Sequence, residues 1–136
     1  MSEKRIAKLS NEQAWVLRAM AQEPDILCSL YPRGIAVPDA LAGDWETAFV
    51  DAWSKDDYEH NDDIKAIDAL LESISGQQNI EYWKTSALSQ EPIWDELRSR
   101  SRHALTLRGM SLLAPDVTQS TYVVDGEVHE PPFDQS

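Results

Sequence analysis

The side chains best suited to chemistry are concentrated between Asp56 and Asp63, where His60 stands among five carboxylates. Imidazole and carboxylate groups can bind divalent metals and can transfer protons in catalysis. However, the segment lacks the glycine and the regularly spaced acids of a calcium-binding loop. A single histidine among carboxylates would hold a divalent ion only loosely. We therefore predict neither a metal nor a cofactor here.

The other potential catalytic groups have no partner that can be recognised in the sequence. Cys28 lies in an apolar stretch, where a buried and inert thiol is expected. His103 falls on the polar face of a predicted helix and His129 in a predicted hairpin, and neither forms a triad with Cys28 or a serine. No glycine-rich phosphate loop is present. We predict no enzyme, and catalysis by residues that converge from distant positions is the alternative left open.

Negative charge is concentrated in a block from Asp39 to Glu72. It holds eleven acids and two bases, so nine of the twelve excess negative charges lie there. The flanking segments carry too few bases to cancel it. A field of this sign favours a basic partner and repels nucleic acid and anionic membranes. The acids are Asp39, Asp44, Glu46, Asp51, Asp56, Asp57, Glu59, Asp62, Asp63, Asp68 and Glu72.

A run of acidic residues is often only a solvated surface, so the assignment of the block as a binding site needs further support. Asp68 and Glu72 are like charges at i,i+4 spacing, which costs a few tenths of a kcal/mol in an isolated helix. Concentrated carboxylates steer a basic partner, and an aromatic side chain among them anchors it. The predicted partner-binding residues are Asp44, Asp51, Asp57, Tyr58, Glu59, Asp62, Asp63, Asp68 and Glu72.

The acidic block fits two related functions. The first is an inhibitor or immunity-type antidote that binds a basic protein, such as a nuclease toxin, and blocks its nucleic-acid site. The second is a nucleic-acid mimic that occupies several DNA-binding proteins. A different class, an assembly or chaperone-type partner, would use apolar surface at Tyr82 and Trp83. The sequence does not predict the oligomeric state.

Direct nucleic-acid binding and membrane binding are not expected. The net charge has the wrong sign for nucleic acid, and the arginines of the last predicted helix do not share one face. Those arginines, for which we expect structural roles, are Arg98, Arg100, Arg102 and Arg108. No apolar stretch is long enough for a signal peptide or a membrane span, and one cysteine excludes an internal disulfide. These features predict a cytoplasmic protein.

Hydrophobic periodicity predicts a mainly α single domain of four to five helices with a small C-terminal β-hairpin. The expected parts are an arm over 1–9, a helical body over 10–110, a hairpin over 116–130 and a frayed tail over 131–136. Helices are predicted from Ser10 to before Pro24, over 44–55, over 62–75 and from 89–92 to 108. Residues 56–61 are predicted as a charged turn. Residues 24–43 are left open between loop and helix: 26–31 could form a short helix, and Pro32, Gly34, Pro38 and Gly43 favour a loop after it. Residues 77–88 could form a short helix or an extended segment. Asp125-Gly126 favours a type I′ turn.

Overall fold

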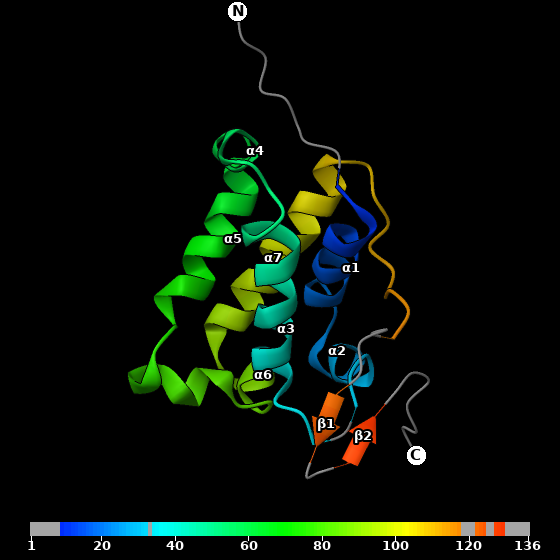
Figure 1. Cartoon of the computed structure of the whole chain (residues 1–136), viewed down its shortest axis with the longest axis vertical. Coiled ribbons are helices and arrows are strands. Elements are labelled where there is room, and N and C mark those ends of the chain that lie inside the picture. Colours follow the sequence, from blue (N-terminus) through cyan, green and yellow to red (C-terminus); the bar gives the residue numbers. More distant parts are fainter. Residues whose placement is uncertain (1–8, 33, 118–121, 125–126, 130–136) are drawn as a thin grey trace, which may run out of the picture.

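The body of the molecule is built from helices packed around one core (Figure 1). The computed structural model describes residues 9–32, 34–117, 122–124 and 127–129. The helices are α1 (Asn11–Met20), α2 (Pro24–Ser29), α3 (Val37–Trp45), a π-helical turn η1 (Glu46–Val50), α4 (Lys55–Glu59), α5 (Asp62–Ser73), a 3₁₀ segment η2 (Gln77–Trp83), α6 (Ala87–Gln90) and α7 (Pro92–Leu107). No helix among them is long and apolar enough to cross a bilayer.

Helix α7 is the central packing element, because it contacts α1, α5 and α6. Its predicted boundaries are confirmed within a residue or two: Pro92 lies in the first turn, and Gly109 follows the end with a φ of 65°. Helix α5 also matches its prediction, with Ile64, Ile67 and Leu71 buried on one face. The two helices thus contribute much of the apolar surface of the core.

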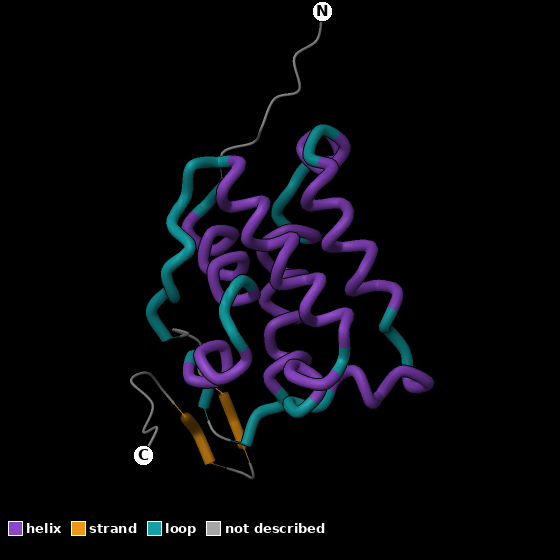
Figure 2. The backbone as a smooth tube through the Cα atoms, turned by 180° about the vertical axis from the view of Figure 1, so that it is seen from behind, coloured by secondary structure: helices purple, strands orange, loops and turns teal. Residues whose placement is uncertain are grey.

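Helix α1 begins directly after Ser10, where its start is predicted, and Ser10 and Gln13 form a capping box. The Ser10 hydroxyl accepts from the Gln13 amide at 3.2 Å, and Gln13 Oε1 accepts from the Ser10 amide at 2.9 Å. The segment after α7 then runs along the outside of α1 (Figure 2). Gln22 Nε2 donates to Leu112 O at 2.9 Å, and Arg18 Nε donates to Leu113 O at 2.9 Å. The polar side chains of Arg18 and Gln22 therefore fix the segment that follows α7 against α1.

The prediction of a helix over 44–55 is wrong at both ends, and the segment 24–43, which was open between loop and helix, contains the start of that helix. The helix begins at Val37, because Pro38 fits a first turn, and it passes through Gly43 into η1, which ends at Val50. Trp45 and Phe49 nevertheless lie on the same buried side of this helical stretch, and their rings stack with centroids 4.3 Å apart.

Three further segments resolve as short helices. Residues 24–29 form α2, and residues 77–88, for which a helix and an extended segment were both open, contain η2 and the start of α6. The predicted charged turn over 56–61 is wrong over most of its length, because residues 55–59 form α4. Acids at the start of α4 complement its dipole, and this stabilises even a single helical turn.

Two short strands follow the helical body. β1 (Tyr122–Val124) pairs antiparallel with β2 (Glu127–His129), with Val123 opposite Val128. The predicted turn residues Asp125 and Gly126 lie outside the described residues, as do the arm over 1–8 and the tail over 131–136. The type I′ turn and the packing of a complete hairpin on the helices therefore stay predictions.

Candidate functional site

One of the predicted binding residues, Asp63, forms an internal ion pair. Arg108 Nη1 donates to Asp63 Oδ2 at 2.5 Å and Arg108 Nη2 donates to Asp63 Oδ1 at 3.2 Å. The side chains of Arg108 and Asp63 are only 4% and 13% exposed. Asn61 joins them, because its Oδ1 accepts from Arg108 Nη2 at 2.9 Å. The Asn61 side chain does not cap α5, and the Asp63 carboxylate pairs α5 with the end of α7.

Asp44 and Asp68 also bond within the fold. Tyr31 donates its hydroxyl to Asp44 Oδ2 at 2.5 Å, and Trp45 Nε1 donates to Asp68 Oδ1 at 3.1 Å. Burial raises the pKa of the Asp44 carboxyl above its ordinary value, and the hydrogen bond from Tyr31 offsets part of that rise. These two acids orient buried aromatic side chains, whereas the sequence pattern alone suggested that they face a partner.

The remaining predicted acids lie nearer to solvent. Asp57 is half-buried, and nothing is described of the Tyr58 side chain. We define the acidic surface as the exposed carboxylates that α3–η1, α4 and α5 contribute, with the residue after η1. Its members are Asp39, Glu46, Asp51, Asp56, Glu59, Asp62 and Glu72. Asp39, Glu46 and Asp56 are exposed members that the predicted set left out.

Most of the acidic surface has no strong internal counter-ion. The side chains of Asp39, Glu46, Asp51 and Glu72 form no hydrogen bond or ion pair with any described residue. Lys55 Nζ lies 3.8 Å from Glu59 Oε1, but both side chains are highly exposed, so the pair contributes little. Asp39 lies on α3 and Glu72 on α5. These two helices are joined by the bond between Trp45 and Asp68 and lie side by side (Figure 1).

The arginines of α7 have structural roles, as expected. Arg98 Nε donates to Gln22 O at 3.0 Å and Arg102 Nε donates to Ala21 O at 2.8 Å, so two cations bond the carboxyl end of α1. Arg100 pairs with Glu96, with Nη2 and Oε1 3.2 Å apart. Each of these three guanidinium groups thus bonds within the fold.

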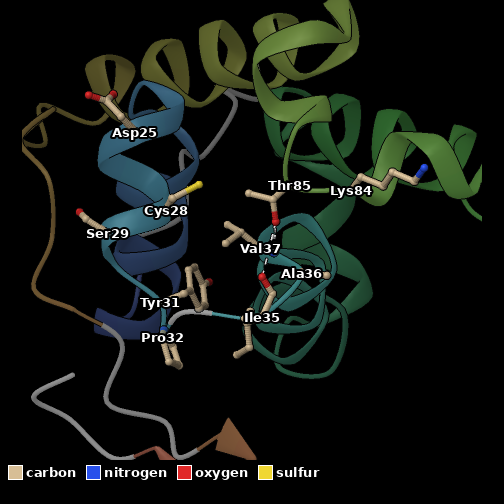
Figure 3. Close-up of a pocket in the computed structure, with 11 residues that line it drawn as sticks. Asp25, Cys28, Ser29, Tyr31, Pro32, Ile35, Ala36, Val37, Lys84 and Thr85 are labelled. Carbon is tan, nitrogen blue, oxygen red and sulfur yellow. Dashed lines mark hydrogen bonds between the residues drawn. The ribbon is translucent and has the colours of Figure 1, made fainter. Parts of the chain in front are cut away.

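A pocket of about 720 Å³ lies between α2, the start of α3 and the segment before α6 (Figure 3). Cys28 points into it, and Thr85 Oγ1 donates to Ile35 O at 3.5 Å. Burial and the nearby charge of Asp25 raise the pKa of the Cys28 thiol. A protonated thiol is a poor nucleophile, and no histidine is among the described residues that line the pocket. Among the described lining residues, Cys28 therefore has no histidine that would activate it.

The two described histidine side chains do not complete a catalytic site. His60 is exposed, with Nδ1 2.7 Å from Asp56 O, and His103 is exposed on α7. Neither lines the pocket beside Cys28 or the groove described next. Within the described ranges, no three His, Cys, Asp or Glu side chains are grouped closely enough to hold a metal ion.

A second hollow, which we call the α3–η2 groove, was missed by sequence reasoning. It has a volume of about 920 Å³ and lies between α3 and η2, with Asp39, Gly43 and Glu46 on one side and Ile80 and Trp83 on the other. Trp83 is half-buried and donates its indole N–H to Ile74 O at 2.6 Å, and its role as a partner contact stays a prediction. Tyr82 is likewise partly buried against the core.

The spacing of Asp39, Gly43 and Glu46 at i, i+4 and i+7 was the available signal for this groove. These three residues share a helix face only if the helix begins at Val37, as it does in α3, and not at Asp44 as predicted.

No protein-family model, curated protein or solved structure matches the chain. The function is therefore inferred from the chain's own residues.

Proposed function

We propose that this chain is a cytoplasmic, immunity-type inhibitor that binds a basic, nuclease-like protein and covers its nucleic-acid site. The observation that carries the proposal is the acidic surface, in which Asp39, Glu46, Asp51 and Glu72 bond no described residue. Carboxylates that serve only the fold would be expected to bond within it, as Asp63 does with Arg108.

The chemistry of such a surface selects a cationic partner. A protein that binds nucleic acid presents clustered lysines and arginines toward phosphates, and carboxylates offer them equivalent acceptors. Complementary charge raises the association rate strongly at low salt. We assign the contacts to the exposed acids Asp51, Glu59, Asp62 and Glu72, with the half-buried Asp57 beside them.

Tyr58 keeps its proposed role as an aromatic anchor. Asp44, Asp63 and Asp68 are assigned to the fold, because each of them bonds an internal side chain. The acidic surface also carries Asp39, Glu46 and Asp56, which widen the proposed contact area.

The proposal is tested by affinity capture from lysate of the native source with three baits. The first is the wild-type chain, and the second carries Asp51→Asn, Glu59→Gln and Glu72→Gln. The third is a matched control that removes three charges outside the block.

The control substitutions are Glu12→Gln, Asp25→Asn and Glu96→Gln, all at exposed positions. Because both variants change the net charge equally, a difference between them reports position rather than total charge. Bound proteins are eluted with rising salt and quantified by mass spectrometry.

We expect one basic protein in stoichiometric amount on the wild-type and control baits, released by salt and lost from the second bait. Several DNA-binding proteins, each displaced by added DNA, would replace the single-target inhibitor with the nucleic-acid mimic. A partner that binds all three baits equally, or one that resists high salt, would contradict the proposed site and indicate an apolar interface.

A further inference from the structure

The α3 side of the α3–η2 groove carries a glycine, Gly43, between Asp39 and Glu46. Gly43 lies inside a continuous helical stretch, and a Cβ added there would meet no atom within 4 Å. The fold therefore does not need glycine at this position to avoid a clash. A glycine inside a helix is less stable than alanine by about 0.5–1 kcal/mol, so its effect here is to leave the groove open.

The groove wall opposite Gly43 is apolar and exposed. Ile80 is 61% exposed, which makes it one of the most exposed large apolar side chains among the described residues. The ring of Trp83 lies beside it and is held by the bond to Ile74. An apolar side chain of a partner would cover Ile80 and occupy the space above Gly43, and both changes remove apolar surface from water.

The groove is negative at both ends of α3. Asp39 and Glu46 line it and bond no described residue. The one base among the described lining residues, Lys84, is neutralised by Glu81, with Nζ and Oε2 2.9 Å apart. The groove therefore offers an apolar centre between two uncompensated carboxylates.

The spacing of these three positions matches a helical partner. Asp39, Gly43 and Glu46 follow each other at i, i+4 and i+7, and Glu46 still has helical backbone angles, so they share one face. The carboxylates are thus about 10 Å apart along the axis. A partner helix with a base, an apolar residue and a base at i, i+4 and i+7 reproduces this spacing, whereas same-side residues of a strand lie two apart.

We propose that the α3–η2 groove binds an amphipathic helix of a partner protein, with two Lys or Arg residues on Asp39 and Glu46 and an apolar residue between them over Gly43. This inference rests on the proposed function and names the part of the basic partner that is recognised. Charge disfavours two other occupants: residues 118–136 hold acids and no base, and a second copy carries the same net charge of −12.

The probe is a fluorescein-labelled helical peptide with Lys, Leu and Lys at i, i+4 and i+7 in a host of alanine and glutamine. Binding to the full chain is followed by fluorescence anisotropy at low and high salt. The test variant is Gly43→Leu, which places a large side chain in the groove at a position where an added Cβ meets no atom within 4 Å. Its control is Ser99→Leu, at an exposed position on α7. Melting curves of both variants show that each is folded.

We expect saturable binding that Gly43→Leu weakens at least about ten-fold and that Ser99→Leu leaves unchanged. Replacing the peptide leucine by glutamine produces a similar loss, and Asp39→Asn with Glu46→Gln reduces both the affinity and its salt dependence. No saturable binding, or binding that is indifferent to Gly43→Leu and to the peptide leucine, overturns the inference. These peptide variants report on the groove even if a protein variant fails to fold.

The arm over residues 1–8 is the competing occupant from this chain, because it contains Lys4, Arg5 and Lys8. A chain lacking residues 2–8 that binds the peptide at least about ten-fold tighter than the full chain would assign the groove to the arm and overturn the inference. Affinity capture separates the two proposals. A partner kept by the Gly43→Leu bait but lost with Asp51→Asn, Glu59→Gln and Glu72→Gln contradicts the groove alone, and a partner kept by both contradicts the acidic surface.

Discussion

At the scale of single residues, the acids of the block divide into those that bond within the fold and those that do not. Sequence reasoning located the block but could not make this division. Asp63 and Arg108 are 45 positions apart, so nothing local marks them as a pair. The bonds of Asp44 and Asp68 to aromatic side chains likewise depend on how helices pack. Exposure of Asp51, Glu59, Asp62 and Glu72, by contrast, agrees with their positions outside the apolar faces.

Removing the buried guanidinium should be the most destabilising charge change in the chain. The Asp63 side chain is only 13% exposed, so Arg108→Met leaves a largely buried carboxylate without its partner. Breaking such a pair costs about 3–5 kcal/mol. The free energy of unfolding in urea measures it. Arg100→Met is the control, because its exposed pair with Glu96 is worth less than about 1 kcal/mol. Equal losses in the two variants would show that the buried pair has no special role.

The raised pKa of Asp44 predicts a pH-dependent effect on stability. A carboxyl whose pKa is higher in the folded state than in the unfolded state stabilises the fold fully below the unfolded value of about 4, and that contribution is lost as pH rises through the folded pKa. Asp44→Asn keeps an acceptor for the Tyr31 hydroxyl but does not titrate. Thermal melts from pH 3 to pH 7 should therefore show the variant gaining stability relative to wild type as pH rises.

The exposed Asp51→Asn is the control for this titration, because Asp51 forms no side-chain bond with a described residue. A difference between Asp44→Asn and wild type that stays constant from pH 3 to pH 7 would contradict the role assigned to burial.

At the scale of elements, helices with a clear apolar stripe were predictable and the rest were not. The apolar stripe of α5, and Pro92 and Gly109 at the two ends of α7, place both helices within a residue or two. Helix α3 was missed because Pro38 and Gly43 favour a loop, yet a proline suits a first turn and burial of Val37, Leu41 and Trp45 outweighs one helical glycine. The groove that Gly43 opens could not be predicted without that helix.

Two glycines should respond to alanine in opposite directions. Gly76 has a φ of 100° and a ψ of 157°, a region that is almost restricted to glycine, so Gly76→Ala should cost about 1–3 kcal/mol. Gly43 is helical and its added Cβ meets no atom within 4 Å, so Gly43→Ala should stabilise the chain by about 0.5–1 kcal/mol. Urea unfolding of both variants tests this pair. Destabilisation by Gly43→Ala would show that the fold itself requires this glycine.

At the scale of the whole molecule, the helices of the core hold the acidic surface on a fixed scaffold. The chain carries an excess of twelve negative charges, and Arg98 and Arg102 of α7 bond backbone carbonyls rather than the acidic surface. An uncompensated field acts on the rate of encounter more than on the lifetime of a complex. This predicts how a complex should respond to salt.

Association with the captured partner should slow steeply as ionic strength rises. The triple variant Asp51→Asn, Glu59→Gln and Glu72→Gln should slow association at low salt by about ten-fold or more and flatten its salt dependence, with a smaller change in dissociation. Stopped-flow fluorescence measures both rates. The control variant Glu12→Gln, Asp25→Asn and Glu96→Gln should retain most of the slope. Identical slopes for the two variants would mean that total charge, and not this surface, steers the partner.

The most direct test of the binding surface is an NMR footprint of the captured partner on the isotope-labelled chain. The account predicts that amide shifts and protection concentrate on α3–η1, α4 and α5, with the exposed face of α7 unchanged. A footprint centred on α7 or on the pocket beside Cys28, with residues 39–72 unaffected, would contradict the assignment of this acidic surface to partner binding.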